Sequence, residues 1–163
     1  MPEIVRKPVL NTMISNVTKL AAGHEHSLAL SKTQELFVWG DGYLTGLGVE
    51  ENVSVPTHLD LYSKAVAKER LTPVVNKISQ IACGGLHTAV VTQSGLLFTW
   101  GSTEGGQLGH EIETEEPSVI KPTRVEYLAK QGIKIAQVSC GEAHTVVLTT
   151  EDQVWGWGMS MYG

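Results

Sequence analysis

A motif that occurs three times constrains this chain more than any other feature of its sequence. Each copy begins with a glycine, places a histidine three residues later, and places a tryptophan thirteen residues after the histidine. Successive histidines are 61 and 57 residues apart, so the length varies only between the motifs. This self-similarity predicts three copies of one structural unit, joined by surface loops of variable length. The three copies are Gly23-His26-Trp39, Gly84-His87-Trp100 and Gly141-His144-Trp157.

Each copy is expected to contain short β-strands separated by turns. In the second copy, residues 78–83, 86–92 and 96–100 are β-rich runs, with turn residues between them. Segments led by proline, at 56–61 and 122–128, are expected to be edge strands, where proline is tolerated. Four short strands with glycine turns are typical of a propeller blade. We therefore predict an all-β fold, a partial β-propeller of three consecutive four-stranded antiparallel blades.

The repeats also set the expected domain organisation. Residues 1–163 are expected to form one partial propeller, with repeats at 8–48, 56–109 and 122–163, the last truncated at its final motif. An open stack of three blades leaves two apolar end faces without a neighbour. We therefore expect the remaining blades to come from the same longer chain or from a second chain.

The motifs resemble those of the regulator of chromosome condensation family, which has Cys-Gly-x-x-His-Thr, then aromatic-x-Trp-Gly, then Gly-Gln-Leu-Gly. The second copy carries all three, and the first has Ala22 in the cysteine position and Gly46 where Gln107 stands. The resemblance implies a ring of seven such blades. The residues of this structural repeat signature are Gly23, His26, Trp39, Gly40, Cys83, Gly84, His87, Trp100, Gly101, Cys140, Gly141, His144, Trp157 and Gly158.

The signature residues are interpreted as structural. Zinc ligands converge within about 2 Å of one point, whereas equivalent positions in different blades are spread around an axis. Each histidine is therefore expected to bind the backbone of its own blade. Cys83 and Cys140 occupy matched positions and are expected to be small buried side chains rather than a disulfide. The repeated tryptophans are expected in the core, and we predict no catalytic residue, metal or cofactor.

Charge and hydropathy exclude several partners. Acidic residues outnumber basic ones by 17 to 12, for a net charge of −5, so attraction to nucleic acid or chromatin is not expected. No apolar run approaches the roughly 20 residues that span a bilayer. The N-terminus lacks the apolar core of a signal peptide, which predicts an intracellular protein, cytoplasmic or nuclear.

Two segments break the symmetry of the repeats and are the candidate partner-binding loops. The first covers residues 62–76 and has helical composition up to Arg70, and the second is an acidic stretch over 111–121. Both could equally be solvated connectors. The candidate residues are Tyr62, Lys64, Lys68, Arg70, Glu111, Glu113, Glu115 and Glu116.

These features favour a non-catalytic scaffold that binds a protein partner through its rim loops. The alternative, implied by the family resemblance, is a guanine-nucleotide exchange factor for a Ran-type small GTPase, which would also act through a surface. The family includes a plant ultraviolet-B photoreceptor with light-sensing tryptophans two residues before the blade histidine. Those positions here hold His24, Gly85 and Glu142, which does not support photoreception.

Overall fold

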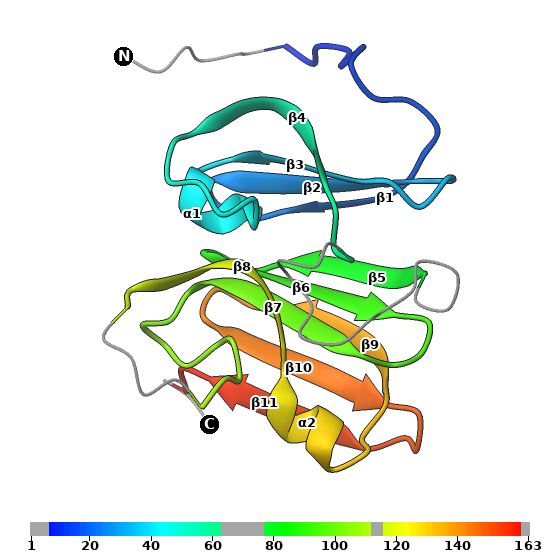
Figure 1. The fold of residues 1–163 in the computed structure, drawn as a ribbon, viewed down its shortest axis with the longest axis vertical. Helices are drawn as coiled ribbons and strands as arrows, with labels where there is room; N and C mark the ends of the chain where they lie inside the picture. The colour runs from blue at the N-terminus through cyan, green and yellow to red at the C-terminus, as the bar shows by residue number, and fades with distance from the viewer. Residues whose placement is uncertain (1–6, 63–76, 112–115, 161–163) are drawn as a thin grey trace.

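The computed structural model describes residues 7–62, 77–111 and 116–160, which form three antiparallel sheets stacked one upon another (Figure 1). The first sheet has the order β1 (Val17–Ala22), β2 (His26–Ser31), β3 (Leu36–Gly40), β4 (Val53–Leu59). The second has the order β5 (Ile78–Cys83), β6 (His87–Thr92), β7 (Leu97–Ser102), β8 (Ser118–Arg124). The third contains β9 (Ile135–Cys140), β10 (His144–Thr149) and β11 (Val154–Gly158). The helices are α1 (Gly42–Thr45) and α2 (Glu126–Lys130). The all-β class and the stacked blades are confirmed.

Each proline-led segment lies partly in an edge strand that begins before the proline and closes the preceding sheet. The expected bounds 56–61 and 122–128 were wrong, because β4 ends at Leu59 and residues 126–128 lie in α2. β4 contains Pro56 and pairs with β3, and β8 contains Pro122 and pairs with β7. The sheets are therefore offset by one strand from the expected repeats 8–48, 56–109 and 122–163. The expectation of four strands in every blade was wrong for the third sheet, which has three strands among the described residues. The segment that was expected to be the edge strand of the third sheet is β8, which instead pairs with β7. The loop after β7 returns the chain antiparallel to β7, and the repeat spacing does not reveal this.

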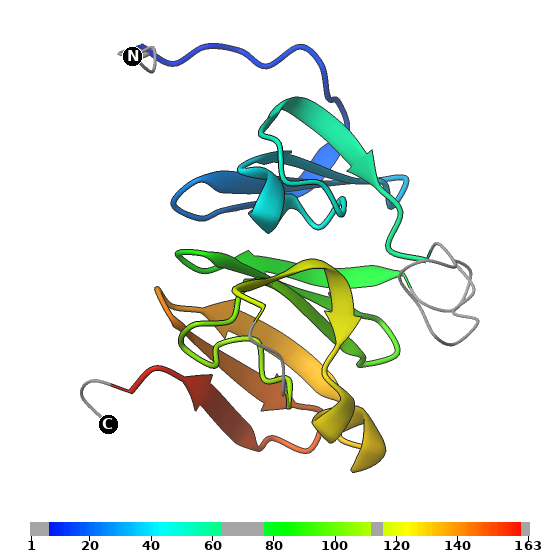
Figure 2. The ribbon, with the colours of Figure 1, turned by 60° about the vertical axis from the view of Figure 1, so that its left-hand side comes forward.

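Figure 2 shows the three sheets as successive layers. The core side chains lie between these layers, in two clusters. Leu28 and Val38 of the first sheet pack with Val90, Phe98 and Trp100 of the second. The opposite face of the second sheet packs against the third in a separate cluster. Every residue of β6 is consequently buried, as expected for a strand that is apolar on both faces.

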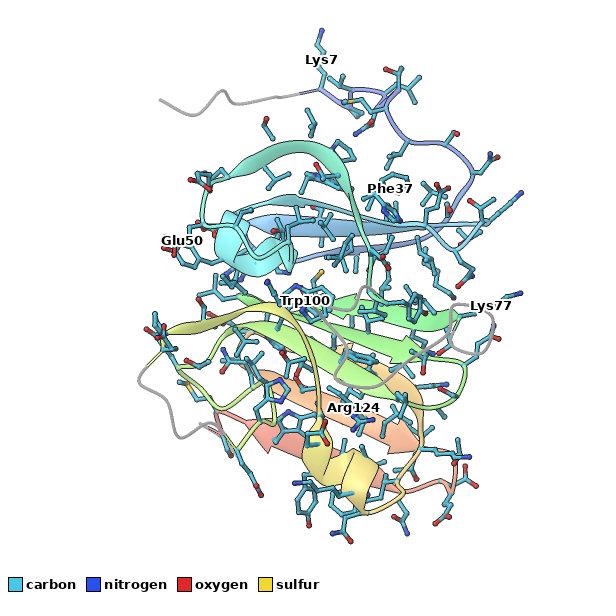
Figure 3. The ribbon with its side chains drawn as sticks, viewed as in Figure 1. Lys7, Phe37, Glu50, Lys77, Trp100 and Arg124 are labelled. Atoms are coloured by element: carbon cyan, nitrogen blue, oxygen red, sulfur yellow. The ribbon has the colours of Figure 1, made fainter. Side chains whose placement is uncertain are left out.

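Antiparallel pairing sends the connections alternately to two opposite rims. We call the rim with residues 23–25, 41–52, 84–86, 103–111, 116–117, 141–143 and 159–160 the loop rim. The turn rim carries residues 32–35, 60–62, 77, 93–96, 125–134 and 150–153. Figure 3 shows Glu50 of the loop rim and Lys77 of the turn rim at opposite sides of the stack. Across the described parts of the chain, no helix is long and apolar enough to cross a membrane.

Candidate protein-interaction surface

The signature histidines connect neighbouring blades. His26 Nε2 lies 2.8 Å from Thr88 Oγ1, and His87 Nε2 lies 2.9 Å from Thr145 Oγ1. Each threonine directly follows the signature histidine of the next blade. The expectation that each ring binds the backbone of its own blade was therefore wrong. Sequence spacing shows that the residue repeats, but it does not show toward which neighbour the ring points.

Hydrogen bonding and burial define the protonation state of these rings. The Thr145 hydroxyl donates to the carbonyl oxygen of Gln107 at 2.8 Å, so it accepts from the Nε2–H of His87. Burial lowers the pKa of both His26 and His87 to about 4. Their Nδ1 atoms are buried and have no partner among the described residues, so protonation would add an unpaired N–H. Both rings are therefore neutral at physiological pH, and His87 is the donor in its contact with Thr145.

The signature tryptophans reach back to the loop of the preceding blade. Trp100 Nε1 donates to the carbonyl oxygen of Leu44, and Trp157 Nε1 donates to that of Gln107, both at 2.9 Å. The structural counterpart of Gln107 is therefore Leu44, not Gly46 as the ungapped comparison of the loops suggested. Gly46 instead corresponds to Gly109, because a Cβ atom at either glycine would lie within 2.8 Å of the indole Nε1.

The glycine before each histidine is required by close packing between blades. A Cβ atom on Gly84 would collide with the ring of His87 and with the carbonyl oxygen of Gly141 in the next blade. The neighbouring turns also exchange backbone hydrogen bonds. The His24 amide donates to Gly85 O at 3.1 Å, and the Gly85 amide donates to Glu142 O at 3.0 Å. These contacts join successive blades at the turns that follow β1, β5 and β9.

The two cysteines are free and partly buried. Burial raises the pKa of the Cys83 and Cys140 thiols to about 12, so little thiolate forms at neutral pH. Within the described ranges, no cluster of three or more histidine, cysteine or acidic side chains could hold a metal ion. The geometry of the signature residues thus accounts for packing between blades and provides no nucleophile.

The candidate loops leave the stack at opposite rims. Tyr62 belongs to the turn rim, whereas Glu111 and Glu116 belong to the loop rim. Tyr62 is partly buried against the first core cluster, and burial raises the pKa of its phenol to about 12. Glu111 and Glu116 are exposed. Lys64, Lys68, Arg70, Glu113 and Glu115 lie outside the described residues.

The loop rim brings together acidic side chains from all three blades. Its described loops contain eight carboxylates and neither lysine nor arginine, whereas those of the turn rim carry both signs of charge. Exposed apolar side chains lie among the carboxylates: Tyr43 is 39% exposed, Val49 37% and Leu86 39%. Sequence reasoning found only the 111–116 part, because the other acidic residues are scattered along the chain. The eight are Glu25, Asp41, Glu50, Glu51, Glu104, Glu111, Glu116 and Glu142.

Sheets stacked face to face, with a histidine and a tryptophan connecting each blade to the next, define a β-propeller segment. The chain belongs to the regulator of chromosome condensation (RCC1) repeat family. One profile of this repeat matches residues 35–91 and 94–148. A second matches residues 17–44, 78–107 and 135–163, each of which begins at the first strand of a sheet.

Relatives in the family are larger proteins. The chain is 34% identical over 165 residues to the probable E3 ubiquitin-protein ligase HERC4 of Homo sapiens, covering 99% of this chain and 14% of the relative. It is 33% identical over 149 residues to the ultraviolet-B receptor UVR8 of Arabidopsis thaliana, covering 90% of this chain and 30% of the receptor. The chain therefore spans less than a third of either relative.

Solved structures of yeast RCC1 (Prp20) share the fold. The structure of Kap60 bound to Prp20 matches with a TM-score of 0.71 at 21% identity, covering 90% of this chain and 33% of that one. The structure of Prp20p from Saccharomyces cerevisiae matches with a TM-score of 0.70 at 22% identity, with 90% and 34% coverage. At this level of identity the likeness shows the fold alone.

Proposed function

We propose that this chain is a non-catalytic scaffold that binds a protein partner through its loop rim, and that the partner presents a basic surface. The observation that carries the proposal is the gathering of eight carboxylates on one rim, whose described loops contain neither lysine nor arginine. Opposite charges on the two binding surfaces speed their encounter and disfavour the binding of acidic competitors. Among the candidate loop residues, Glu111 and Glu116 belong to this surface, and Tyr62 does not.

Two further features support a protein rather than a small molecule as the partner. The exposed side chains of Tyr43, Val49 and Leu86 provide apolar contacts within the acidic rim, as interfaces generally require. The blades beneath are joined by the hydrogen bonds of His87 and Trp157, and they form a rigid support for the loops. Prp20, which has the same fold, was solved with Kap60 bound, so proteins of this architecture can bind other proteins.

Site-specific photo-crosslinking in the full-length protein tests the proposal. A photoreactive amino acid at Val49 on the loop rim should capture discrete proteins by proximity. The matched probe at Tyr127 on the turn rim, which is 48% exposed, should not. Captured proteins should bind with an affinity that falls steeply with salt and is lost in Glu50→Lys/Glu51→Lys. Equal capture at both rims, or binding that is indifferent to charge reversal, would refute the proposal.

Nucleotide exchange on a Ran-type GTPase remains the alternative prediction. Prp20p was solved in a study that names Gsp1p and histones among its binding partners, and that property belongs to Prp20p. The experiment is GDP release from Ran with the full-length protein. Acceleration at substoichiometric concentration would favour exchange over a pure scaffold, and an unchanged rate would leave the scaffold proposal standing.

A further inference from the structure

A polar pair, Thr99 and His110, anchors the loop of the second blade at a point where the first blade has apolar residues. Val38 corresponds to Thr99, since each precedes a signature tryptophan. Leu47 corresponds to His110, since each follows the glycine that packs against an indole. Val38 is fully buried in the first core cluster, and Leu47 packs against that cluster. Apolar packing therefore holds the loop of the first blade here, whereas the second blade uses hydrogen bonds.

The pair fixes the turn of residues 108–110 to strand β7. The hydroxyl of Thr99, which is fully buried, donates to the carbonyl oxygen of Leu108 at 2.7 Å. Because its proton is used in that bond, the hydroxyl accepts from the Nε2–H of His110, which lies 2.9 Å away. The same Nε2 lies 3.4 Å from the carbonyl oxygen of Thr99. One buried hydroxyl therefore holds both ends of this turn.

This turn leads directly into the acidic part of the loop rim. Glu111 follows His110 in the chain, and its side chain is exposed. On the returning side of the loop, the Thr103 hydroxyl donates to Glu116 O at 2.8 Å, and the Thr103 amide donates to Pro117 O at 3.0 Å. Hydrogen bonds therefore hold the chain at both of these carboxylates. Among the groups that make these bonds, the imidazole of His110 is the one that titrates near neutral pH.

The surroundings of the ring favour its neutral form. Burial lowers the pKa of His110, because the charged ring would lose its hydration, and the bond to Thr99 and the carboxylate of Glu126 oppose this effect without cancelling it. Glu126 on α2 is itself paired with Arg124 of β8 at 3.0 Å, and Glu111 is the adjacent charge on the loop. A ring released into water regains a pKa of about 6.5, so acid favours the released ring over the bound one.

We propose that Thr99 and His110 form a latch that positions the acidic loop of the second blade for the protein partner, and that protonation of the ring opens this latch. Both are positioning residues, because they act through the loop rather than by touching the partner. The inference rests on the proposed function, since it concerns the same loop rim. With the latch closed, Glu111 has a fixed place on the rim. With the latch open, binding must first order the loop, and the affinity falls.

Hydrogen exchange of the full-length protein without a partner tests the latch. The protection of residues 103–111, corrected for the intrinsic exchange rate at each pH, should fall severalfold between pH 7 and pH 5. One titrating ring limits this fall to about thirtyfold. His110→Gln keeps a donor that cannot be protonated, so its protection should stay constant. Thr99→Val removes the acceptor and should lower protection about tenfold at pH 7. Thr123→Val is the matched control, because its exposed hydroxyl lies directly across from Thr99 on β8.

The affinity for the protein captured by the Val49 probe tests the positioning role. Loops open at little cost in free energy, so a tenfold loss of protection leaves much of the loop open. Thr99→Val should therefore bind severalfold more weakly than Thr123→Val at pH 7, and the parent should bind more weakly than His110→Gln at pH 5.

The two measurements separate the possible failures. Equal protection of the parent and His110→Gln at pH 5 would overturn the latch. A latch that opens without a difference in affinity would overturn its positioning role. An absence of capture at Val49 would instead overturn the proposed function, and the exchange measurement would still decide whether the latch exists.

Discussion

Thr145→Val tests whether the contact between blades stabilises the fold as the geometry implies. The Thr145 hydroxyl accepts from His87 Nε2 at 2.9 Å and donates to the Gln107 carbonyl oxygen at 2.8 Å. Valine has nearly the same shape and is equally suited to a strand, so packing changes little. The carbonyl oxygen keeps its second donor, Trp157 Nε1. The main effect of the substitution is therefore to remove the hydrogen-bond acceptor of His87.

The expected cost follows from the burial of that ring. His87 is 0% exposed, so water cannot replace the lost acceptor. Changing the tautomer does not help, because Nδ1 is also without a partner in the described structure. A buried N–H left unpaired costs about 1–3 kcal/mol. We expect the free energy of unfolding to fall by about 2 kcal/mol, which lowers Tm by about 4–8 °C in a protein of this size.

Urea denaturation of the parent chain and three variants measures this cost. Thr145→Ser keeps the hydroxyl and should recover most of the lost stability. Thr123→Val is the matched control, because its exposed hydroxyl bonds to Lys121 O and water can replace that contact. Its effect should stay within about 0.5 kcal/mol. If Thr145→Val cost no more than Thr123→Val, the contact would not stabilise the native fold.

Three further measurements follow from the same packing. The two neutral histidines between blades have a pKa of about 4 when folded and about 6.5 when unfolded, so the unfolded state binds more protons between these values. Stability should therefore fall as the pH drops from 7 to 5, by about 2 kcal/mol for each ring, and a flat profile would contradict their burial. Gly84→Ala should destabilise far more than Gly156→Ala, since a Cβ atom on Gly84 would collide with His87 and Gly141 whereas one on Gly156 would meet only ordinary contacts at 3.8 Å, and equal denaturation midpoints would contradict this. Cys83 and Cys140 should react with a thiol reagent slowly in the folded chain and rapidly in urea, because burial raises their thiol pKa to about 12, and fast native labelling would show exposed thiolates.

Much of the architecture could be predicted because each repeat is recognised by the spacing of residues within a single hairpin. The interval from His26 to Trp39 is set by the geometry of one hairpin, β2 and β3, and the same hairpin recurs as β6–β7 and β10–β11. The acidic loop rim could not be found in this way. Glu25, Glu50 and Glu142 are far apart in sequence and share a rim only because antiparallel strands return their turns to the same side.

The sequence by itself determined the all-β blades, their number, and the residues that repeat in each. Only the tertiary structure decided that the histidine ring contacts the next blade, that Pro56 and Pro122 lie in strands closing the preceding sheets, and that Leu44 corresponds to Gln107. The physical reason is the range of the interactions. Strand and turn propensities act over a few residues, whereas the direction of a buried ring is set by the hydroxyl it meets 62 residues away.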